Sequence, residues 1–305
     1  MIRVQGPKSS SLWSRIQDSP LFWLLPALVF LLLFYTWPLL DVIRLSFTNA
    51  SLISPDYTYS LDSYRRVFRD PATWRTLKVT LIFAAGSVVL KLVLGMLLAL
   101  AIDAGVKRGL HGIVIVRTSI LAAWVIPGVF VGILWKILLS TSSHGLLNYW
   151  IESLSGTSVG FLTDTRLALG TTILANVWRG VAFTMILLYA GLQRIPPELY
   201  EAAKVDGAGA FARFRFVTLP MLAPIIFIAL VLITIGGINT FDLIMAMTQG
   251  GPAQATEVVG MRVYQQVFKF MNLGRGAAIA VVLLAVNLLM TLIYLRLLRL
   301  NRKID

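Results

Sequence analysis

The stretch PPELYEAAKVDGAGAFARFRFVTLPML, residues 196–222, is a polar segment in an otherwise strongly apolar chain. Two prolines at its start suit the first turn of a helix, where a missing N–H group costs nothing. Glu198 and Glu201 then favour the positive end of the helix dipole, and Gly207 and Gly209 end the helix. A second short helix over about 210–217 follows. Because such short helices are not stable alone, we expect this stretch to dock on another surface; an amphipathic hairpin lying on lipid headgroups is the alternative.

The chain around this stretch has the composition of a membrane protein. It is 57% hydrophobic and 13% charged, whereas a soluble domain is about a quarter charged. Apolar runs of about 20 residues can cross a bilayer, where backbone groups must bond internally. The sequence therefore predicts an all-α integral membrane protein with six transmembrane helices, over residues 21–40, 79–102, 113–139, 167–191, 221–247 and 276–295.

The positive charges predict the orientation of these spans. Lys and Arg are more numerous on the side of the two termini and of loop 194–220 than on the other side. By the positive-inside rule, both termini and that loop are cytoplasmic, with the loop joining spans four and five. We expect a cytoplasmic segment at 1–20, a membrane domain at 21–299 and a cytoplasmic tail at 300–305. The net charge of +13 is thus a topology signal, and no nucleic-acid partner is expected.

Apart from Arg117 near one end of the third, four charged residues fall inside the predicted spans, where charge is costly and usually marks a cavity or a pair. Lys136 lies near a span end and can reach water. For Lys91, structural pairing, an interior water pocket and transport all stay open. Arg179 and Asp242 lie on the two spans that loop 194–220 joins. They either form a buried salt bridge or line a solute path.

Catalytic motifs are missing from the sequence. It contains no phosphate-binding loop of the form G-x-x-x-x-G-K-[ST], and no His or acidic cluster with metal-ligand spacing. We therefore predict a chain that is not an enzyme and holds no metal.

The loop resembles the EAA signature of permease subunits in ABC importers. The resemblance rests on Glu201-Ala202-Ala203, Gly207 and Val217-x-Leu219-Pro220, where Val217 replaces the usual Ile. The stretches NVWRGVAFTMILLYAGLQRIPPELYEAA (176–203) and NTFDLIMAMTQGGP (239–252) are similar to the carbohydrate-uptake, maltose-type branch. This resemblance extends from Leu77 to the C-terminus.

The resemblance implies a coupling helix that sits in a groove on a cytoplasmic ATPase and swings the spans as a rigid body. Glu201 would contact the ATPase, and Gly207 would permit the tight turn. Carried over by position, the coupling residues are Glu201, Ala202, Ala203, Asp206, Gly207, Leu219 and Pro220. It further implies a bacterial or archaeal plasma membrane and, as partners, a second permease chain, two ATPase subunits and an extracytoplasmic solute-binding protein. ATP and Mg²⁺ would bind to the ATPase, so this chain needs no cofactor.

The resemblance also implies a sugar site on spans four and five, formed by Arg179, Gly180, Phe183, Gly237, Asn239, Thr240 and Asp242. Phe183 can stack on a sugar face, and Asn239 and Thr240 can bind hydroxyl groups. Gly237 stands where the comparison expects a polar amide, and Arg179 where it expects an apolar residue. Our hypothesis is that the substrate is a sugar derivative with a negative group held by Arg179.

Two other classes of membrane protein predict different sequence features. A self-contained secondary transporter predicts inverted repeats and several intramembrane coupling carboxylates. The sequence shows no repeat, and Asp242 is the single carboxylate within a predicted span. A membrane-embedded enzyme needs clustered acids, histidines or a nucleophile near one face, and the sequence has none. The importer is the favoured interpretation.

Overall fold

The computed structural model describes residues 20–54, 56–142 and 145–301, and every named element in them is a helix. Two isolated β-bridges, Thr48 with Tyr59 and Ser51 with Asn272, tie the loops at one end. The predicted all-helical class is confirmed. The predicted terminal segments, 1–20 and 300–305, lie almost wholly outside the described residues.

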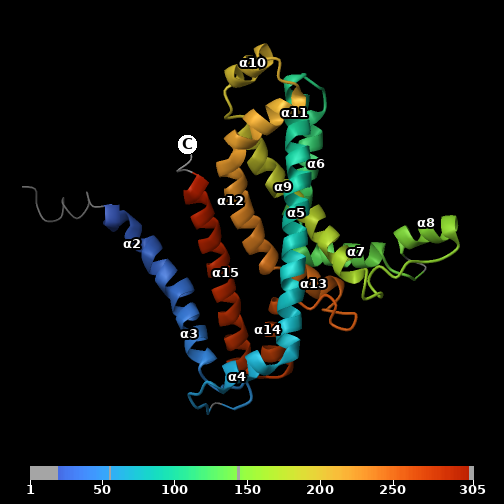
Figure 1. Ribbon diagram of the computed structural model, residues 1–305. Helices are drawn as coiled ribbons and strands as arrows, with labels where there is room; N and C mark the ends of the chain where they lie inside the picture. Colours follow the sequence, from blue (N-terminus) through green and yellow to red (C-terminus); the bar gives the residue numbers. More distant parts are fainter. Residues whose placement is uncertain (1–19, 55, 143–144, 302–305) are drawn as a thin grey trace, which may run out of the picture.

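The helices form a long bundle (Figure 1). Along the chain they are α2 Pro20–Leu31, a π-helical turn η1 Leu32–Thr36, α3 Trp37–Ser46, α4 Asp62–Arg69, α5 Pro71–Lys107, α6 Ile113–Val125, α7 Gly128–Leu138, α8 Leu146–Ser155, α9 Ala168–Leu192, α10 Pro197–Val205, α11 Ala210–Arg213, a π-helical turn η2 Phe214–Thr218, α12 Leu219–Ile238, α13 Asp242–Met247, α14 Val259–Tyr264, a π-helical turn η3 Gln265–Lys269 and α15 Leu273–Asn301. Within the described residues, five helices are long and apolar enough to cross a membrane, or six if α6 and α7 form one broken span.

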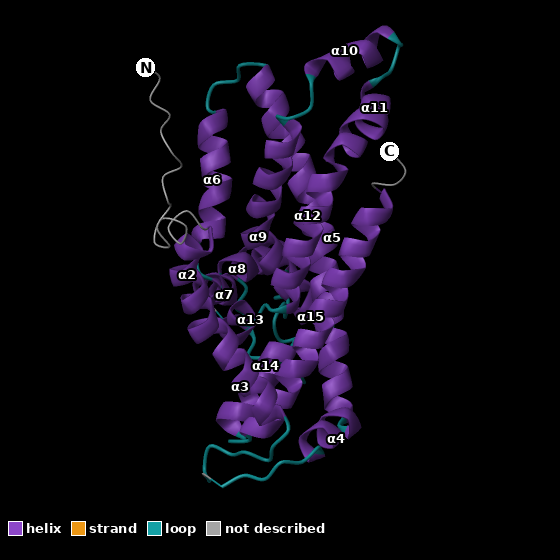
Figure 2. Ribbon diagram, turned by 90° about the vertical axis from the view of Figure 1, so that its left-hand side faces the viewer, coloured by secondary structure: helices purple, strands orange, loops and turns teal. Residues whose placement is uncertain are grey.

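The helices α5, α9, α12 and α15 run roughly along the bundle (Figure 2), and α5, with 37 residues, is much longer than α12, with 20. α5 packs along α9 and α12, and α3 packs along α15. α10 lies at one end of the bundle and α4 at the other (Figure 1). These two ends, called the α10 end and the α4 end below, carry most of the polar loops.

The third predicted span is not a straight helix, so the prediction of one helix over 113–139 is wrong. α6 and α7 meet at an angle of 100°. The break lies at Ile126, which is extended (φ −66°, ψ 126°), and at Pro127. Proline lacks an N–H donor and disfavours the helical conformation of the residue before it, so the helix ends there.

The fifth predicted span differs in two ways from the expectation of a helix over 221–247. It starts earlier, because α11, η2 and α12 form one continuous helix rather than a separate short helix followed by a span. Pro220 does not interrupt this helix, and the π-helical turn η2 lies just before it. The span is also broken between Ile238 and Asp242, where α13 begins.

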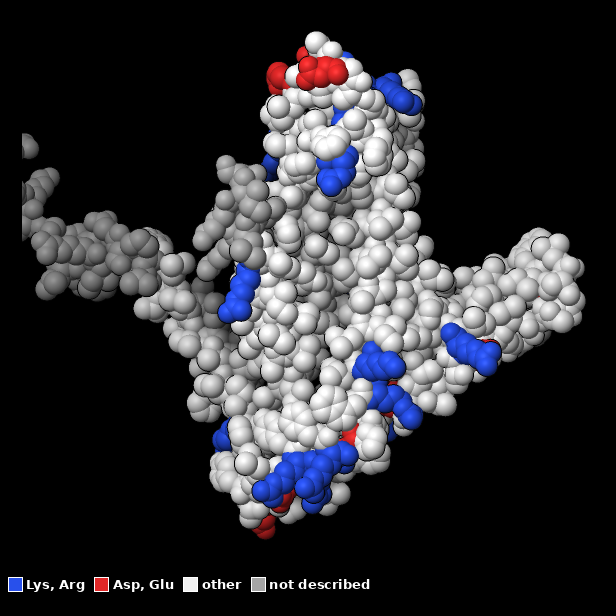
Figure 3. Space-filling view, in the orientation of Figure 1, with Lys and Arg blue, Asp and Glu red and all other residues white. Residues whose placement is uncertain are grey.

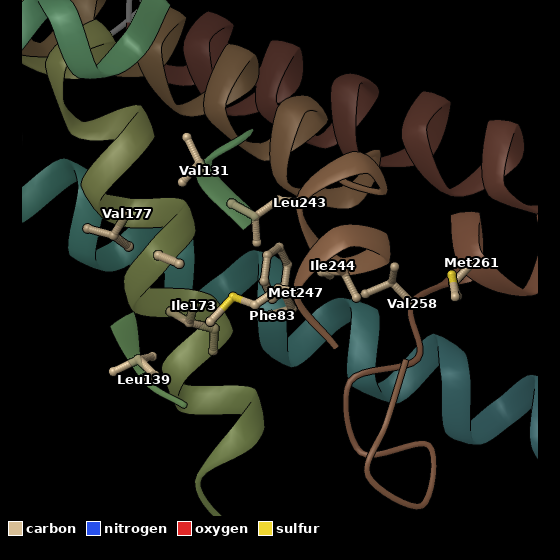
Figure 4. Packing of buried hydrophobic residues seen from close by; sticks show 11 residues of the cluster. Phe83, Val131, Leu139, Ile173, Val177, Leu243, Ile244, Met247, Val258 and Met261 are labelled. Carbon is tan, nitrogen blue, oxygen red and sulfur yellow. The ribbon is translucent and has the colours of Figure 1, made fainter. Parts of the chain in front are cut away.

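Two clusters of buried side chains fix the bundle on either side of these breaks. The first packs α7 and α13 against α5 and α9 (Figure 4), and includes Phe83, Val131, Ile173, Leu243 and Met247. The second lies toward the α10 end and includes Met96, Ile102, Met185, Leu188 and Leu222. Since lipid is as apolar as leucine, close packing rather than water exclusion holds such helices together. The first cluster therefore holds α7 and α13, the segments that follow the breaks, against α5 and α9.

Candidate solute pathway and coupling loop

Arg179 and Asp242 form a loose ion pair beside the two breaks. The Arg179 guanidinium donates to Asp242 Oδ2 at 3.5 Å, near the upper limit for a hydrogen bond. The side chains are 28% and 42% exposed, respectively. The structure therefore shows the pairing that the sequence left open, and it leaves both groups accessible to a solute.

Gly128, at the start of α7, makes room for this pair. A Cβ atom at that position would overlap the Asp242 carboxylate and reach Arg179 Nη1 at 2.5 Å. A side chain there would displace one or both partners. The glycine after Pro127 therefore allows α7 to begin directly against the ion pair.

Two more of the predicted pathway residues lie near the break between α6 and α7. The Phe183 ring packs on Trp124 of α6, with ring centroids 5.5 Å apart, and Trp124 is 47% exposed. Gly180 lies against Lys91 of α5. Trp124 was not predicted from the sequence, where its position three residues before Pro127 was the only signal.

The other three predicted pathway residues pack against or hydrogen-bond to other residues of this chain. Gly237 is buried, and a Cβ there would lie 3.4 Å from the backbone of Ala84 on α5. The Thr240 hydroxyl donates to the Gly236 carbonyl at 2.8 Å. Asn239 and Asn287 of α15 exchange side-chain hydrogen bonds of 3.3 Å. Arg179, Gly180, Phe183 and Asp242 thus lie around the two breaks. Asn239 and Thr240 lie within the second break with their side chains hydrogen-bonded inside the chain, and Gly237 packs against α5.

The predicted coupling loop projects from the α10 end. Gly207 has φ +78°, a left-handed conformation that favours glycine, and it turns the chain out of α10. Glu201, Ala202 and Asp206 are exposed, and Ala203 is half-buried. Leu219 and Pro220 form the first turn of α12. The outward side of α10 is therefore accessible.

A polar network attaches α10 to the spans. The Tyr200 hydroxyl shares a hydrogen bond of 2.9 Å with Thr218 at the start of the fifth span. The Lys107 ammonium lies 5.5 Å from the centroid of the Tyr200 ring and 2.8 Å from Asp103. Gln193 donates to Asp103 at 2.7 Å. Together these contacts connect the ends of α5 and α9 with α10 and the start of the fifth span, around a cavity of about 740 Å³.

The α4 end carries a second ionic cluster. Asp70 caps α5 by accepting from the Ala72 N–H at 3.0 Å, and it accepts from Arg262 and Arg275 at 2.5 Å each. Glu257 also pairs with Arg262, at 3.3 Å. Burial raises the pKa of Asp70, but the cap hydrogen bond and the two arginines outweigh it and hold that pKa below its usual value.

Arginines gather around this cluster at the α4 end (Figure 3). They line an open groove of about 550 Å³ formed by Asp62, Arg65, Arg66, Arg69, Asp70 and Arg275. Neither was predicted from the sequence. The ionic cluster joins Asp70 to residues near 257–275, and the groove adds Arg275 to a set that otherwise lies within residues 62–70.

Broken spans around a charged pair are typical of membrane transport proteins. The family model for binding-protein-dependent transport system inner membrane components matches residues 91–303. The chain belongs to this family. It is a multi-pass permease subunit of an ABC importer in the inner membrane, and a transport subunit rather than an enzyme.

Relatives of known role match most of the chain. The sulfoquinovosyl glycerol permease SmoG of Agrobacterium fabrum is 33% identical over 98% of this chain and 97% of its own. The trehalose/maltose permease MalF of Thermococcus litoralis is 34% identical over 92% of this chain and 93% of its own. The structure is similar to one chain of a bacterial ABC transporter involved in the import of the acidic polysaccharide alginate. The TM-score is 0.81, and the sequences are 25% identical, with 96% of this chain and 99% of that chain covered.

Proposed function

We propose that this chain forms half of the translocation pathway for a sugar derivative that carries an anionic group, and that Arg179 holds that group. The position of Arg179 carries the proposal. It lies in the middle of α9 beside two broken spans, partly exposed, with one weak ionic partner. A cation in a membrane is retained where it serves a solute or a partner, and this partner is held loosely.

The relatives support a sugar-like solute and are compatible with an anionic one. One relative is named for sulfoquinovosyl glycerol, whose sulfoquinovosyl group carries a sulfonate, and another belongs to an importer of an acidic polysaccharide. The third is named for trehalose and maltose, which are neutral. The names alone do not choose between the two kinds of sugar, so the choice rests on Arg179.

The chain in this proposal has six spans, α6 and α7 together forming the third, with both termini and α10 in the cytoplasm. The α10 end carries Lys107, Arg108, Arg194, Lys204 and Arg213, in keeping with the positive-inside rule. α10 is then the coupling helix, with Glu201 facing the ATPase. The polar network around Tyr200 would transmit its motion to the spans.

The assembly in this proposal contains a second, different permease chain and two ATPase subunits. ATP and Mg²⁺ bind to the ATPase subunits, and this chain contributes no ligand to them. An extracytoplasmic solute-binding protein delivers the solute at the α4 end, where loops 48–75 and 248–275 meet. The family assignment decides against a self-contained secondary transporter.

The test is ATPase stimulation of the reconstituted importer by its binding protein, loaded in turn with anionic and neutral glycosides. We expect the native complex to respond to an anionic glycoside, and Arg179→Ala to lose that response by about tenfold or more, the size of a charge-assisted hydrogen bond. Stimulation by a neutral sugar that is unchanged in Arg179→Ala would reduce Arg179 to a structural partner of Asp242. The family assignment would then stand without the anionic substrate.

A further inference from the structure

Lys91 is a buried cation beside the ion pair. It lies in the middle of α5 and is 7% exposed. Its side chain crosses Gly180 of α9, where a Cβ atom would come within 2.7 Å of the Lys91 Nζ. Gly180 follows Arg179 directly, so the ammonium group reaches the helix that carries the pathway arginine.

No acidic side chain neutralises Lys91. Within the part of the chain that the structure describes, it makes no salt bridge or hydrogen bond, and the neighbouring charge that acts on it is Arg179, which is also positive. Asp242 is already the partner of Arg179. Lys91 on α5 therefore adds a second positive group next to the segment of α9 that carries Arg179, and the ion pair there supplies one negative group.

The helix surfaces around Lys91 are polar and closely spaced. One turn to the α4 side, Asn176 donates to Ser87 at 2.9 Å. One turn to the α10 side, Gly95 lets α5 approach Thr184 of α9 closely. A Cβ atom added at Gly95 would lie 2.8 Å from the Cβ of Thr184. The Thr184 hydroxyl is buried there without a hydrogen-bond partner. The contact between α5 and α9 therefore fixes the position of Lys91 but provides no anionic partner for it.

An unpaired ammonium in a low-dielectric interior is costly, and a bound anion would remove that cost. A sulfonate or phosphate has three terminal oxygens, enough to accept from two cations on two helices. We propose that Lys91 is the second cationic arm of the anion site, so that α5 and α9 together bind a sulfonate- or phosphate-bearing sugar. This inference rests on the proposed function and adds a residue and an anion class to it.

The test measures anion binding directly, without knowledge of the transported sugar. The assembled importer is titrated with sodium sulfate, and its apparent melting temperature is followed against sodium chloride at matched ionic strength. We expect saturable stabilisation of the native importer by sulfate. Lys91→Met should weaken the apparent sulfate affinity about tenfold, the size of one charge-assisted hydrogen bond. Lys91→Arg should keep most of it.

Controls separate this inference from the proposed function. Lys136→Met removes an exposed lysine from α7 and should leave sulfate binding unchanged. Lys91→Gln replaces Lys91→Met if the latter fails to assemble. Native sulfate affinity in the neutral Lys91 variant, with affinity lost in Arg179→Ala, would overturn the role of Lys91 and leave the proposed function intact. No stabilisation of the native importer by sulfate would overturn the two-cation site, and the ATPase test with glycosides would then decide the proposed function separately.

Discussion

Single residues set the geometry of the candidate pathway through the space that they leave open. Gly128 lets α7 begin against the Arg179–Asp242 pair, and Gly180 leaves room for Lys91. Neither glycine has a left-handed backbone, so the lack of a side chain, rather than backbone freedom, explains them. The charged groups of the pathway are therefore positioned by small residues on the opposing helices.

Gly128→Ala should destabilise the protein by about 1–3 kcal/mol, because the new methyl group displaces the ion pair. The measurement is the apparent melting temperature in detergent, with Gly170→Ala as the control, since Gly170 has open space around it. The destabilisation should be smaller in an Asp242→Ala background, where the obstructing carboxylate is gone. Equal losses in both backgrounds would show that the methyl group meets something other than this pair.

At the scale of helices, the sequence predicts that a helix exists better than it predicts whether that helix is straight or broken. Long apolar runs require helices in lipid, so the spans near residues 79–102, 167–191 and 276–295 lie within α5, α9 and α15. The breaks at Pro127 and Asn239 fall inside apolar runs and do not alter the hydropathy. Contacts such as Tyr200 with Thr218, or Asp70 with Arg262, join residues 18 or more apart and depend on the packed fold. The short helix α10 and the turn at Gly207 were predictable because their proline and glycine signals are local, whereas the coupling role of the stretch stays a prediction.

Tyr200→Phe should weaken the link between α10 and the fifth span. It removes the hydroxyl that bonds to Thr218 but keeps the ring beside Lys107. A net hydrogen bond of about 0.5–1.5 kcal/mol corresponds to a roughly two- to tenfold fall in ATPase stimulation by the loaded binding protein. Tyr149→Phe, on exposed α8, is the matched control. Native stimulation in Tyr200→Phe would show that the hydroxyl contact does not transmit the motion.

Asp70→Asn should lower stability at neutral pH, because Arg262 and Arg275 lose their shared carboxylate while asparagine still caps α5. Since the folded pKa of Asp70 is lowered, its charge stabilises the fold above the unfolded pKa of about 3.9 and loses this effect as pH falls through the folded pKa. The native protein should therefore lose apparent melting temperature below about pH 4 more steeply than Asp70→Asn. Asp62→Asn, at a solvent-exposed pair, should change little. Parallel pH curves for native protein and Asp70→Asn would contradict the assignment.

At the scale of the whole molecule, the two ends of the bundle are built for different contacts. The α4 end is fixed by the Asp70 cluster, which joins α5, α14 and α15, and it presents an arginine-lined groove. The α10 end presents a short helix that is attached to the spans by a few polar contacts around a cavity. The charged pathway residues lie between these ends, at the breaks. In the proposed mechanism, a motion of α10 would reach the fifth span, which carries Asp242, through the contact of Tyr200 with Thr218, away from the Asp70 cluster at the opposite end.

Glu201→Lys should uncouple the chain from its energy source if α10 is the part that the ATPase moves. Glu201 is exposed on α10, so its reversal should leave the fold of this chain intact while placing a repulsive charge at the ATPase contact. We expect the purified importer to lose most of the binding-protein stimulation of ATP hydrolysis, by about tenfold or more, at an unchanged apparent melting temperature of the isolated chain. Glu152→Lys on α8 makes the same charge change on an exposed helix away from α10 and should keep full stimulation. Full stimulation in Glu201→Lys would place the ATPase contact elsewhere on the α10 end, whereas a similar loss in both variants would mean that net charge, rather than this position, determines assembly.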